Sequence, residues 1–258
     1  MPDLLHERRG NVAWITFNRP EARNALTFAM YEELARLCEA ANGDKDLRVM
    51  VLRGAGDKAF ASGTDINQFR AFKSPQDALD YEARIDRILT ALEQVRVPTI
   101  AAISGACTGG GAGIAACCDL RVATRASRLG FPIARTLGNC LSSANLSRLT
   151  GLVGAARVKE MIFTAKLIGA EDAAKIGLVH EVVDDLPALE ARVQELAGEV
   201  AAMAPLTLRS TKEGLRRLQH RLTREEAEDL ILMCYMSGDF REGMDAFLNK
   251  RPPHWRGE

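Results

Sequence analysis

Several features are absent from this 258-residue chain, and each absence excludes a class of protein. Acidic and basic side chains balance at 34 each, so the formal net charge is zero. Proteins that bind nucleic acids or membrane surfaces carry a basic excess, and we expect neither partner here. No apolar run reaches the roughly 18–20 residues of a membrane span. The first residues, Met1 to Glu7, contain neither a basic region nor an apolar signal core, so we expect a cytoplasmic protein.

The six cysteines lack the spacing of a metal site, and the adjacent Cys117 and Cys118 would rarely form a disulfide with each other. Most of the six lie in apolar stretches. The six are Cys38, Cys107, Cys117, Cys118, Cys140 and Cys234. We therefore expect buried, reduced thiols, as in a cytoplasmic protein, and no bound metal ion.

Hydrophobic periodicity predicts an α/β protein. The expected strands cover residues 4–8, 12–17, 49–53, 99–103, 120–123 and 178–183. The expected helices cover residues 27–41, 74–92, 112–118, 142–149, 155–163, 169–175, 187–204, 206–218 and 223–237. Strands and helices alternate in the first two thirds, and helices fill the last third. We therefore expect a core over residues 1–200 and a C-terminal helical section over residues 201–258.

The most informative segment is the triple glycine Gly109–Gly111, which follows an expected buried strand and opens an apolar helix. The first N–H groups of a helix have no intrahelical acceptor and lie at the positive end of the helix dipole. Such a place holds negative charge, including charge that develops on an oxygen during a reaction. A second glycine loop, Phe60–Asp65, can supply a partner N–H. Two donors aimed at one carbonyl oxygen would stabilise an enolate.

Seven segments in order along nearly the whole chain resemble the enoyl-CoA hydratase/isomerase (crotonase) superfamily. They are Asn18–Leu26, Lys58–Ile66, Pro98–Gly105, Gly109–Gly111, Cys118–Leu120, Ala170–Val179 and Arg241–Arg251. The resemblance implies a spiral of ββα units. It also implies a homotrimer or a dimer of trimers, packed through the C-terminal helices.

The resemblance further implies an acyl-CoA thioester substrate, with coenzyme A as part of the substrate and no permanently bound cofactor. By position, the thioester oxygen would lie between the backbone N–H groups of Thr64 and Gly110. The loop that holds the adenine and pantetheine parts would contribute Ala61, Ser62, Asp65 and Ile66. The CoA phosphates would meet Arg23 and Lys250.

The chain departs from the family at two positions that matter for proton transfer. Hydratases of this family use two glutamates, and the matching positions here are Gly113 and Ile133, neither of which can transfer a proton. The stretch after Ile133 lines the acyl pocket in the family, and we select Asn139 and Cys140 as its pocket-lining residues. Nearby polar residues have structural interpretations: Asp65 and Ser142 as helix caps, Tyr81 as lid or core packing, and Cys140 alternatively as a buried small residue.

Three functions remain open. The favoured one is a lyase or isomerase of acyl-CoA metabolism that stabilises an enolate without the glutamate pair, by decarboxylation, carbon–carbon cleavage or isomerisation. The second is an enoyl-CoA hydratase that uses other polar residues. The third is a non-catalytic acyl-CoA-binding subunit. Serine hydrolysis of the Clp protease type is disfavoured, because no histidine follows a serine where a triad would need it.

Overall fold

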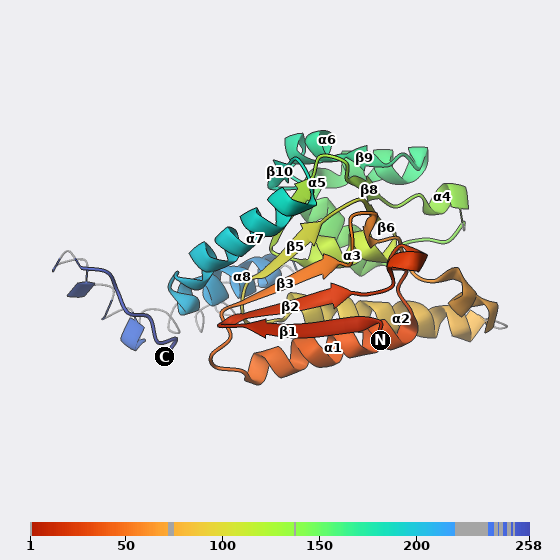
Figure 1. The fold of residues 1–258 in the computed structure, drawn as a ribbon. Helices are drawn as coiled ribbons and strands as arrows, with labels where there is room; N and C mark the ends of the chain where they lie inside the picture. Colours follow the sequence, from red (N-terminus) through yellow and green to blue (C-terminus); the bar gives the residue numbers. More distant parts are fainter. Residues whose placement is uncertain are drawn as a thin grey trace.

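Two β-sheets, joined by a chain that winds between them, form the frame of the molecule (Figure 1). The computed structural model describes residues 2–71, 75–136, 138–219, 237–239, 242, 245–246, 249 and 251–258. Within these ranges, no helix is both long and apolar enough to cross a bilayer.

The larger sheet has six strands in the spatial order β1-β2-β3-β5-β7-β10. They are β1 (Leu4–Arg9), β2 (Val12–Phe17), β3 (Val49–Gly54), β5 (Thr99–Ile103), β7 (Leu120–Thr124) and β10 (Glu181–Val183). All neighbours run parallel except β1 and β2, which form the predicted hairpin around Gly10. Gly10 has a φ of 59°, the left-handed backbone that a tight hairpin turn requires.

The smaller sheet is formed by the second strands of successive two-strand units of the chain, together with β9. Its four strands, in the order β4-β6-β8-β9, are β4 (Ala59–Ala61), β6 (Ala106–Thr108), β8 (Arg128–Gly130) and β9 (Ile168–Gly169). The chain thus runs from β3 to β4, from β5 to β6 and from β7 to β8, and each pair leads to a helix. These helices are α2 (Pro75–Glu93), α3 (Gly110–Cys117) and α4 (Ile133–Thr136), with a 3-10 turn, η2 (Ile66–Ala71), before α2. The predicted spiral of ββα units is therefore confirmed.

Helices cover both faces of the large sheet, which explains why its central strands are mostly buried and apolar. Helix α1 (Phe28–Gly43) lies with α2 on one face, and α7 (Leu186–Ala201) covers the other (Figure 1). Along β2, Ile15 and Phe17 enter the core on the α1 side, whereas Val12 and Trp14 pack with residues of α7. Successive strand residues point to opposite faces, so one strand serves two cores.

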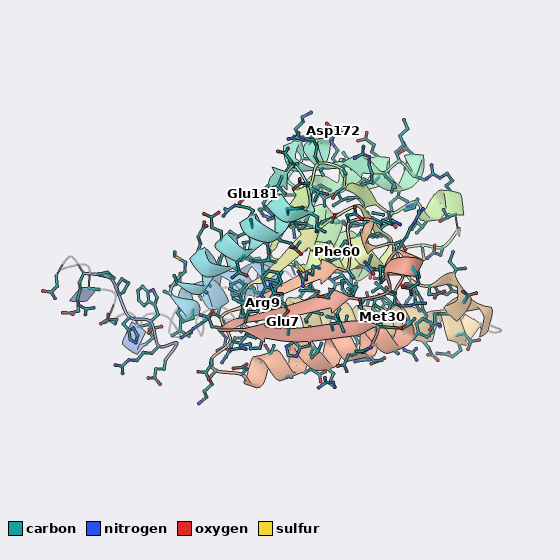
Figure 2. All side chains as sticks on the ribbon, in the orientation of Figure 1. Glu7, Arg9, Met30, Phe60, Asp172 and Glu181 are labelled. Carbon is teal, nitrogen blue, oxygen red and sulfur yellow. The ribbon has the colours of Figure 1, made fainter. Side chains whose placement is uncertain are left out.

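The side chains labelled in Figure 2 include residues of the core and residues of the surface. Phe60 of β4 is fully buried and meets Phe17 edge to face, with ring centroids 5.3 Å apart. Met30 of α1 belongs to the same core. Glu7 and Arg9 form an ion pair on β1 at the exposed edge of the large sheet, with 2.8 Å between Glu7 Oε2 and Arg9 Nη2. The core beneath the small sheet thus supports the loops that follow its strands.

Most predicted elements are confirmed with small shifts at their ends. Thr27 caps α1 by accepting a hydrogen bond from the Met30 N–H. Helix α3 begins at Gly110, two residues earlier than expected, while the last strand shrinks to β10. The two helices expected over residues 142–163 form α5 (Ser143–Thr164), which Gly154 interrupts with a φ of 77°. The remaining elements are η1 (Pro20–Ala22), α6 (Ala170–Lys175) and α8 (Pro205–Gln219).

Three short strands were missed, the expectation of a buried thiol was wrong for one cysteine, and one expected helix falls outside the described residues. Strands β4, β6 and β8 were not predicted, because runs of three residues show no periodicity to detect. Cys140 is exposed and does not share the burial of Cys38, Cys107, Cys117 and Cys118. The expected helix 223–237 lies almost wholly outside the described part of the chain.

Candidate active site

A cavity of about 210 Å³ opens where three strands of the small sheet end. Residues after β4, β6 and β8 line one side of it, and α2 lines the other. Eight residues selected from the sequence share this lining, namely Ser62, Thr64, Ile66, Gly110, Gly113, Ile133, Asn139 and Cys140. The structure therefore brings together both predicted oxyanion residues, both vacated acid positions and both predicted pocket residues.

The N–H groups of Thr64 and Gly110 are both free to meet a ligand in this cavity. The Leu26 N–H donates to the Gly63 carbonyl at 2.8 Å, and the Asp65 N–H donates to the Leu26 carbonyl at 2.9 Å. These bonds fix the loop on either side of Thr64 and leave its own N–H unused by any described residue. Gly110 is the first residue of α3, so its N–H has no intrahelical acceptor.

Each glycine of the triple run is required for a different reason. Gly109 has a φ of 53° in a backbone conformation that side chains disfavour. A Cβ on Gly110 would lie 2.0 Å from the Tyr31 hydroxyl oxygen. A Cβ on Gly111 would lie 2.2 Å from the Ala61 carbonyl oxygen. The glycines thus let the start of α3 approach β4 and α1 closely enough to complete the site.

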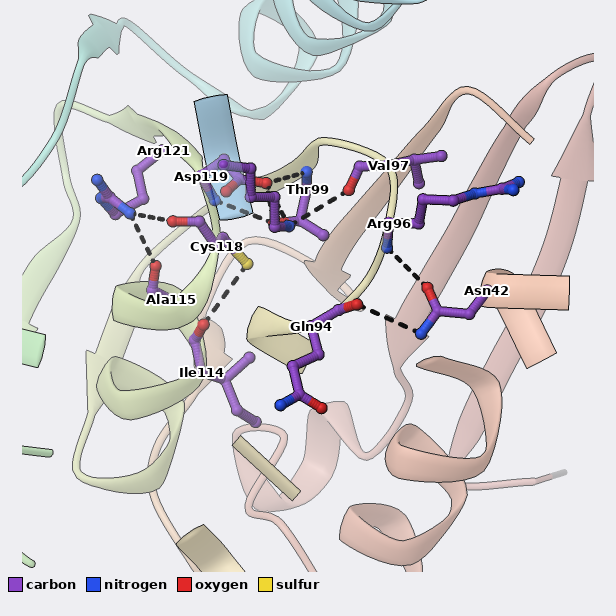
Figure 3. Close-up of polar contacts among 11 residues, drawn as sticks. Asn42, Gln94, Arg96, Val97, Thr99, Ile114, Ala115, Cys118, Asp119 and Arg121 are labelled. Carbon is purple, nitrogen blue, oxygen red and sulfur yellow. Dashed lines mark hydrogen bonds and ion pairs between the residues drawn. The ribbon is translucent and has the colours of Figure 1, made fainter. Parts of the chain in front are cut away.

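The far end of α3 is held by the buried guanidinium of Arg121 (Figure 3). Arg121 donates to the carbonyls of Ala115 and Cys118 at the C-terminus of the helix, and to Leu178 O at 2.8 Å. A cation at this end complements the helix dipole. Next to it, Asp119 accepts hydrogen bonds from the Thr99 N–H at 2.7 Å and from the Thr99 hydroxyl at 2.9 Å. These contacts fix α3, whose first residue, Gly110, lines the cavity.

Three hydroxyl groups form a chain beside the two N–H groups. Thr64 Oγ1 lies 3.0 Å from the Tyr31 hydroxyl and 3.0 Å from the Tyr81 hydroxyl. Burial raises the pKa of both phenols above their usual value of about 10, so both stay protonated at neutral pH. Phe69 holds the Tyr81 ring edge to face at 5.0 Å. Tyr81 therefore packs against Phe69 and also reaches Thr64, in the loop predicted to supply an N–H donor.

Neither vacated acid position offers a proton-transfer group. Gly113 has no side chain, and a Cβ placed there would make an ordinary 3.6 Å contact with Leu89 Cδ1. Ile133 is 7% exposed and apolar. Among the described residues that line the cavity, Glu82 of α2 is the one carboxylic acid.

Three residues expected to bind CoA lie outside the lining of this cavity, and a fourth lies outside the described residues. Asp65 accepts hydrogen bonds from the Asn67 N–H and from Arg19 Nη1, both at 3.1 Å, and the first of these lowers the pKa of its carboxyl. This confirms its structural role at the start of η2. Ala61 is fully buried in β4, so only its backbone is available to a ligand. Arg23 is exposed beside this loop, where its carbonyl accepts from the Ser62 N–H, and Lys250 lies outside the described residues.

Sequence reasoning missed Tyr31 and Glu82. Both carry a signal in their helical spacing. Tyr31 lies three residues before Leu34, and Glu82 lies three residues before Ile85, so each falls on the apolar stripe of its helix. A polar atom on a buried stripe needs a partner or a function. Among the described residues, no three His, Cys, Asp or Glu side chains gather as metal ligands would.

The two-sheet spiral of ββα turns defines the α/β class of this fold, and the residues after three of its strands meet at one cavity. A family model described as enoyl-CoA hydratase/isomerase matches residues 7–258. A crotonyl-CoA hydratase of Syntrophomonas wolfei is 33% identical over 253 residues, which cover 96% of each chain.

Solved structures agree with this match. An enoyl-CoA hydratase/carnithine racemase from Magnetospirillum magneticum superposes with a TM-score of 0.93 at 33% identity, over 100% of this chain and 97% of that one. An enoyl-CoA hydratase/isomerase family protein from Hyphomonas neptunium gives a TM-score of 0.92 at 35% identity, over 98% and 97%. The chain belongs to the enoyl-CoA hydratase/isomerase family and has the crotonase fold. It is thus a member of a family of acyl-CoA enzymes.

Proposed function

We propose that this protein binds an acyl-CoA thioester and stabilises its enolate between the N–H groups of Thr64 and Gly110, without the two-glutamate mechanism of hydratases. One observation carries the proposal. Thr64 and Gly110, whose N–H groups meet no acceptor among the described residues, line the same cavity as Gly113 and Ile133, the two positions at which a hydratase of this family would hold its glutamates.

The reaction that fits this arrangement forms an enolate by loss of a leaving group or by movement of one proton. In decarboxylation or carbon–carbon cleavage, the bond next to the α-carbon breaks and its electron pair moves toward the thioester oxygen. In isomerisation, an α-proton leaves and a proton returns elsewhere. In each case negative charge grows on the oxygen that meets Thr64 and Gly110, and one such donor contributes about 3 kcal/mol to the transition state.

The CoA part of the substrate would extend over the loop that follows β4. Ser62 and Ile66 line the cavity mouth, and Ile66 is 61% exposed, which offers an apolar surface to the adenine ring. Arg23 stands beside this loop and would meet a phosphate, as Lys250 would by family position. We further propose that residues 201–258 form a separate helical section that packs three chains into a trimer or a dimer of trimers.

Infrared spectroscopy of a bound thioester tests this proposal directly. Butyryl-CoA and crotonyl-CoA, each labelled with ¹³C at the thioester carbonyl, are added to the purified protein. Two N–H donors polarise the carbonyl, so we expect its stretching band to move to lower wavenumber on binding. Binding without a shift of the band would contradict the assignment of Thr64 and Gly110 as donors to the thioester oxygen. If neither thioester binds, the proposal of acyl-CoA recognition is contradicted.

A panel of thioesters then separates the alternatives by product analysis. Malonyl-CoA, methylmalonyl-CoA, a 3-enoyl-CoA and crotonyl-CoA report decarboxylation, isomerisation and hydration. We expect turnover of one of the first three and no enzymatic loss of the crotonyl-CoA absorbance. Hydration at an enzymatic rate would support the hydratase alternative, whereas binding with no turnover would support a non-catalytic subunit.

A further inference from the structure

Glu82, which has no described partner for its carboxylate, lines the cavity that contains the proposed enolate site. It follows Tyr81 on α2, whose hydroxyl lies 3.0 Å from Thr64 Oγ1, and both side chains line the cavity shared with Gly110. Glu82 is half-buried, and among the described residues no group donates a hydrogen bond to its carboxylate or forms an ion pair with it.

Three other carboxylates of α2, unlike that of Glu82, each accept a hydrogen bond. One turn further along, Asp86 accepts a hydrogen bond from the Ser142 hydroxyl at 2.6 Å. Glu93 accepts one from Arg148 Nη2 at 2.8 Å. On the exposed side, Asp80 accepts one from Gln76 Nε2 at 2.7 Å. These three carboxylates are explained by the contacts they make, and Glu82 is not.

Leaving a carboxylate unpaired at a half-buried position costs free energy, because the charge loses water without gaining a donor. Burial, followed by the negative charge of Asp86, raises the pKa of the Glu82 carboxyl above its usual range. Both protonation states therefore become accessible closer to neutral pH, which is the condition for a group that accepts and returns protons.

We propose that Glu82 is the catalytic acid–base residue of this site, exchanging a proton with the α-carbon of the acyl group; this rests on the proposed enolate function. In the forward step the α C–H bond breaks, and an O–H bond forms on the Glu82 carboxylate. The electron pair moves to the thioester oxygen, which the N–H groups of Thr64 and Gly110 hold. In the reverse step the Glu82 carboxylic acid returns the proton to carbon, so one carboxyl serves both directions.

Deuterium exchange measures this step without knowledge of the natural acyl group. Butyryl-CoA is incubated in D₂O with the full-length protein, and mass spectrometry follows deuterium at the α-carbon. We expect wild-type protein to catalyse exchange and Glu82→Gln to lose at least about 100-fold of the rate, the usual contribution of a general base. Asp80→Asn, which neutralises an exposed carboxylate two residues away on the same helix, should exchange at the wild-type rate. Glu82→Asp should restore part of the rate.

Calorimetric titration with butyryl-CoA and a melting curve accompany each variant. Glu82→Gln that binds and melts like wild type but does not exchange supports the proposal. Retained exchange in Glu82→Gln overturns it, as does a wild-type protein that binds butyryl-CoA without exchanging its α-protons. A wild-type protein that does not bind butyryl-CoA overturns the proposed function, and the role of Glu82 with it.

Discussion

The Tyr31 hydroxyl occupies the space in which a side chain on Gly110 would begin, since a Cβ there would lie 2.0 Å from the hydroxyl oxygen. Tyr31 is 1% exposed and therefore has little room to move aside. The close approach couples α1, which carries the phenol, to α3, which carries the proposed oxyanion N–H of Gly110. Packing between these two helices thus sets the geometry of the site.

A methyl group should have opposite effects at two glycines of α3. We expect Gly110→Ala to cost about 1–3 kcal/mol, as overpacking of a rigid core does. Gly113→Ala meets Leu89 Cδ1 at an ordinary 3.6 Å and should be neutral or stabilising by up to about 1 kcal/mol, because alanine favours a helix over glycine. Urea unfolding of the two variants measures this contrast, and equal costs would contradict it.

Removing the Tyr31 hydroxyl should relieve the strain of Gly110→Ala. Tyr31→Phe alone loses a hydrogen bond to Thr64 and should cost about 1 kcal/mol. Once that hydroxyl is gone, Thr64 Oγ1, at 3.2 Å, becomes the nearest obstacle to a methyl group on Gly110. The double variant should therefore be more stable than the sum of the single costs predicts. Additivity within about 0.5 kcal/mol in a double-mutant cycle would argue against this coupling.

The α-proton exchange should lose rate at acid pH as Glu82 becomes protonated. Because its pKa is raised in the folded protein, the midpoint of this limb should lie above about 4.3, the value of an ordinary glutamate. The titratable groups that face Glu82 are Asp86 on the same helix, Tyr81 beside it and Tyr31 from α1. Asp86 in turn forms an ion pair with Arg148 of α5, with 3.8 Å between Asp86 Oδ1 and Arg148 Nη1.

Of these, Asp86 is the anion whose charge raises the pKa of Glu82. Asp86→Asn keeps a hydrogen-bond acceptor for Ser142 and removes the charge, so the acid limb should move to lower pH. The exchange rate is measured across pH for wild type and variant. A limb that stays in place would show that another group titrates.

Cys140 gives a chemical test of where the acyl group lies. It is exposed and lines the cavity, whereas the other four cysteines among the described residues are buried. We expect iodoacetamide to modify Cys140 before those four, and saturating butyryl-CoA to slow the reaction. Peptide mapping identifies the modified thiol, with Cys140→Ser as the control. Modification at the same rate with and without ligand would place the acyl group elsewhere.

Long, periodic segments could be predicted from the sequence, and short or context-dependent features could not. The stripe of α1 and the run from Thr99 to Ile103 specify a helix and a strand by residue pattern alone. The three-residue strands β4, β6 and β8 exist because neighbouring turns of the spiral pair with them, and a local pattern does not contain that information.

The candidate site divides in the same way. The glycine run before a helix could be recognised from the sequence itself as a place that holds negative charge, and the resemblance to the family then assigned the two donors to Thr64 and Gly110. Glu82 could not be selected from the sequence, because a glutamate on an amphipathic helix usually faces water. Its place in the lining of the cavity is visible only in the structure. Its spacing from Ile85 and Leu89 was the available signal, and it becomes informative once the apolar face is known to border a site.

The spiral also explains how one fold can change its chemistry. Thr64 follows β4, Gly110 follows β6 and Ile133 follows β8, so three successive turns present the same topological position to one cavity. The two cores of the sheets stabilise the fold, while these three junctions and the facing helix line the proposed reaction site. Substitution of a few residues at these equivalent junctions can therefore change the reaction while the two sheets keep their structure. One fold can in this way support several reactions of thioesters.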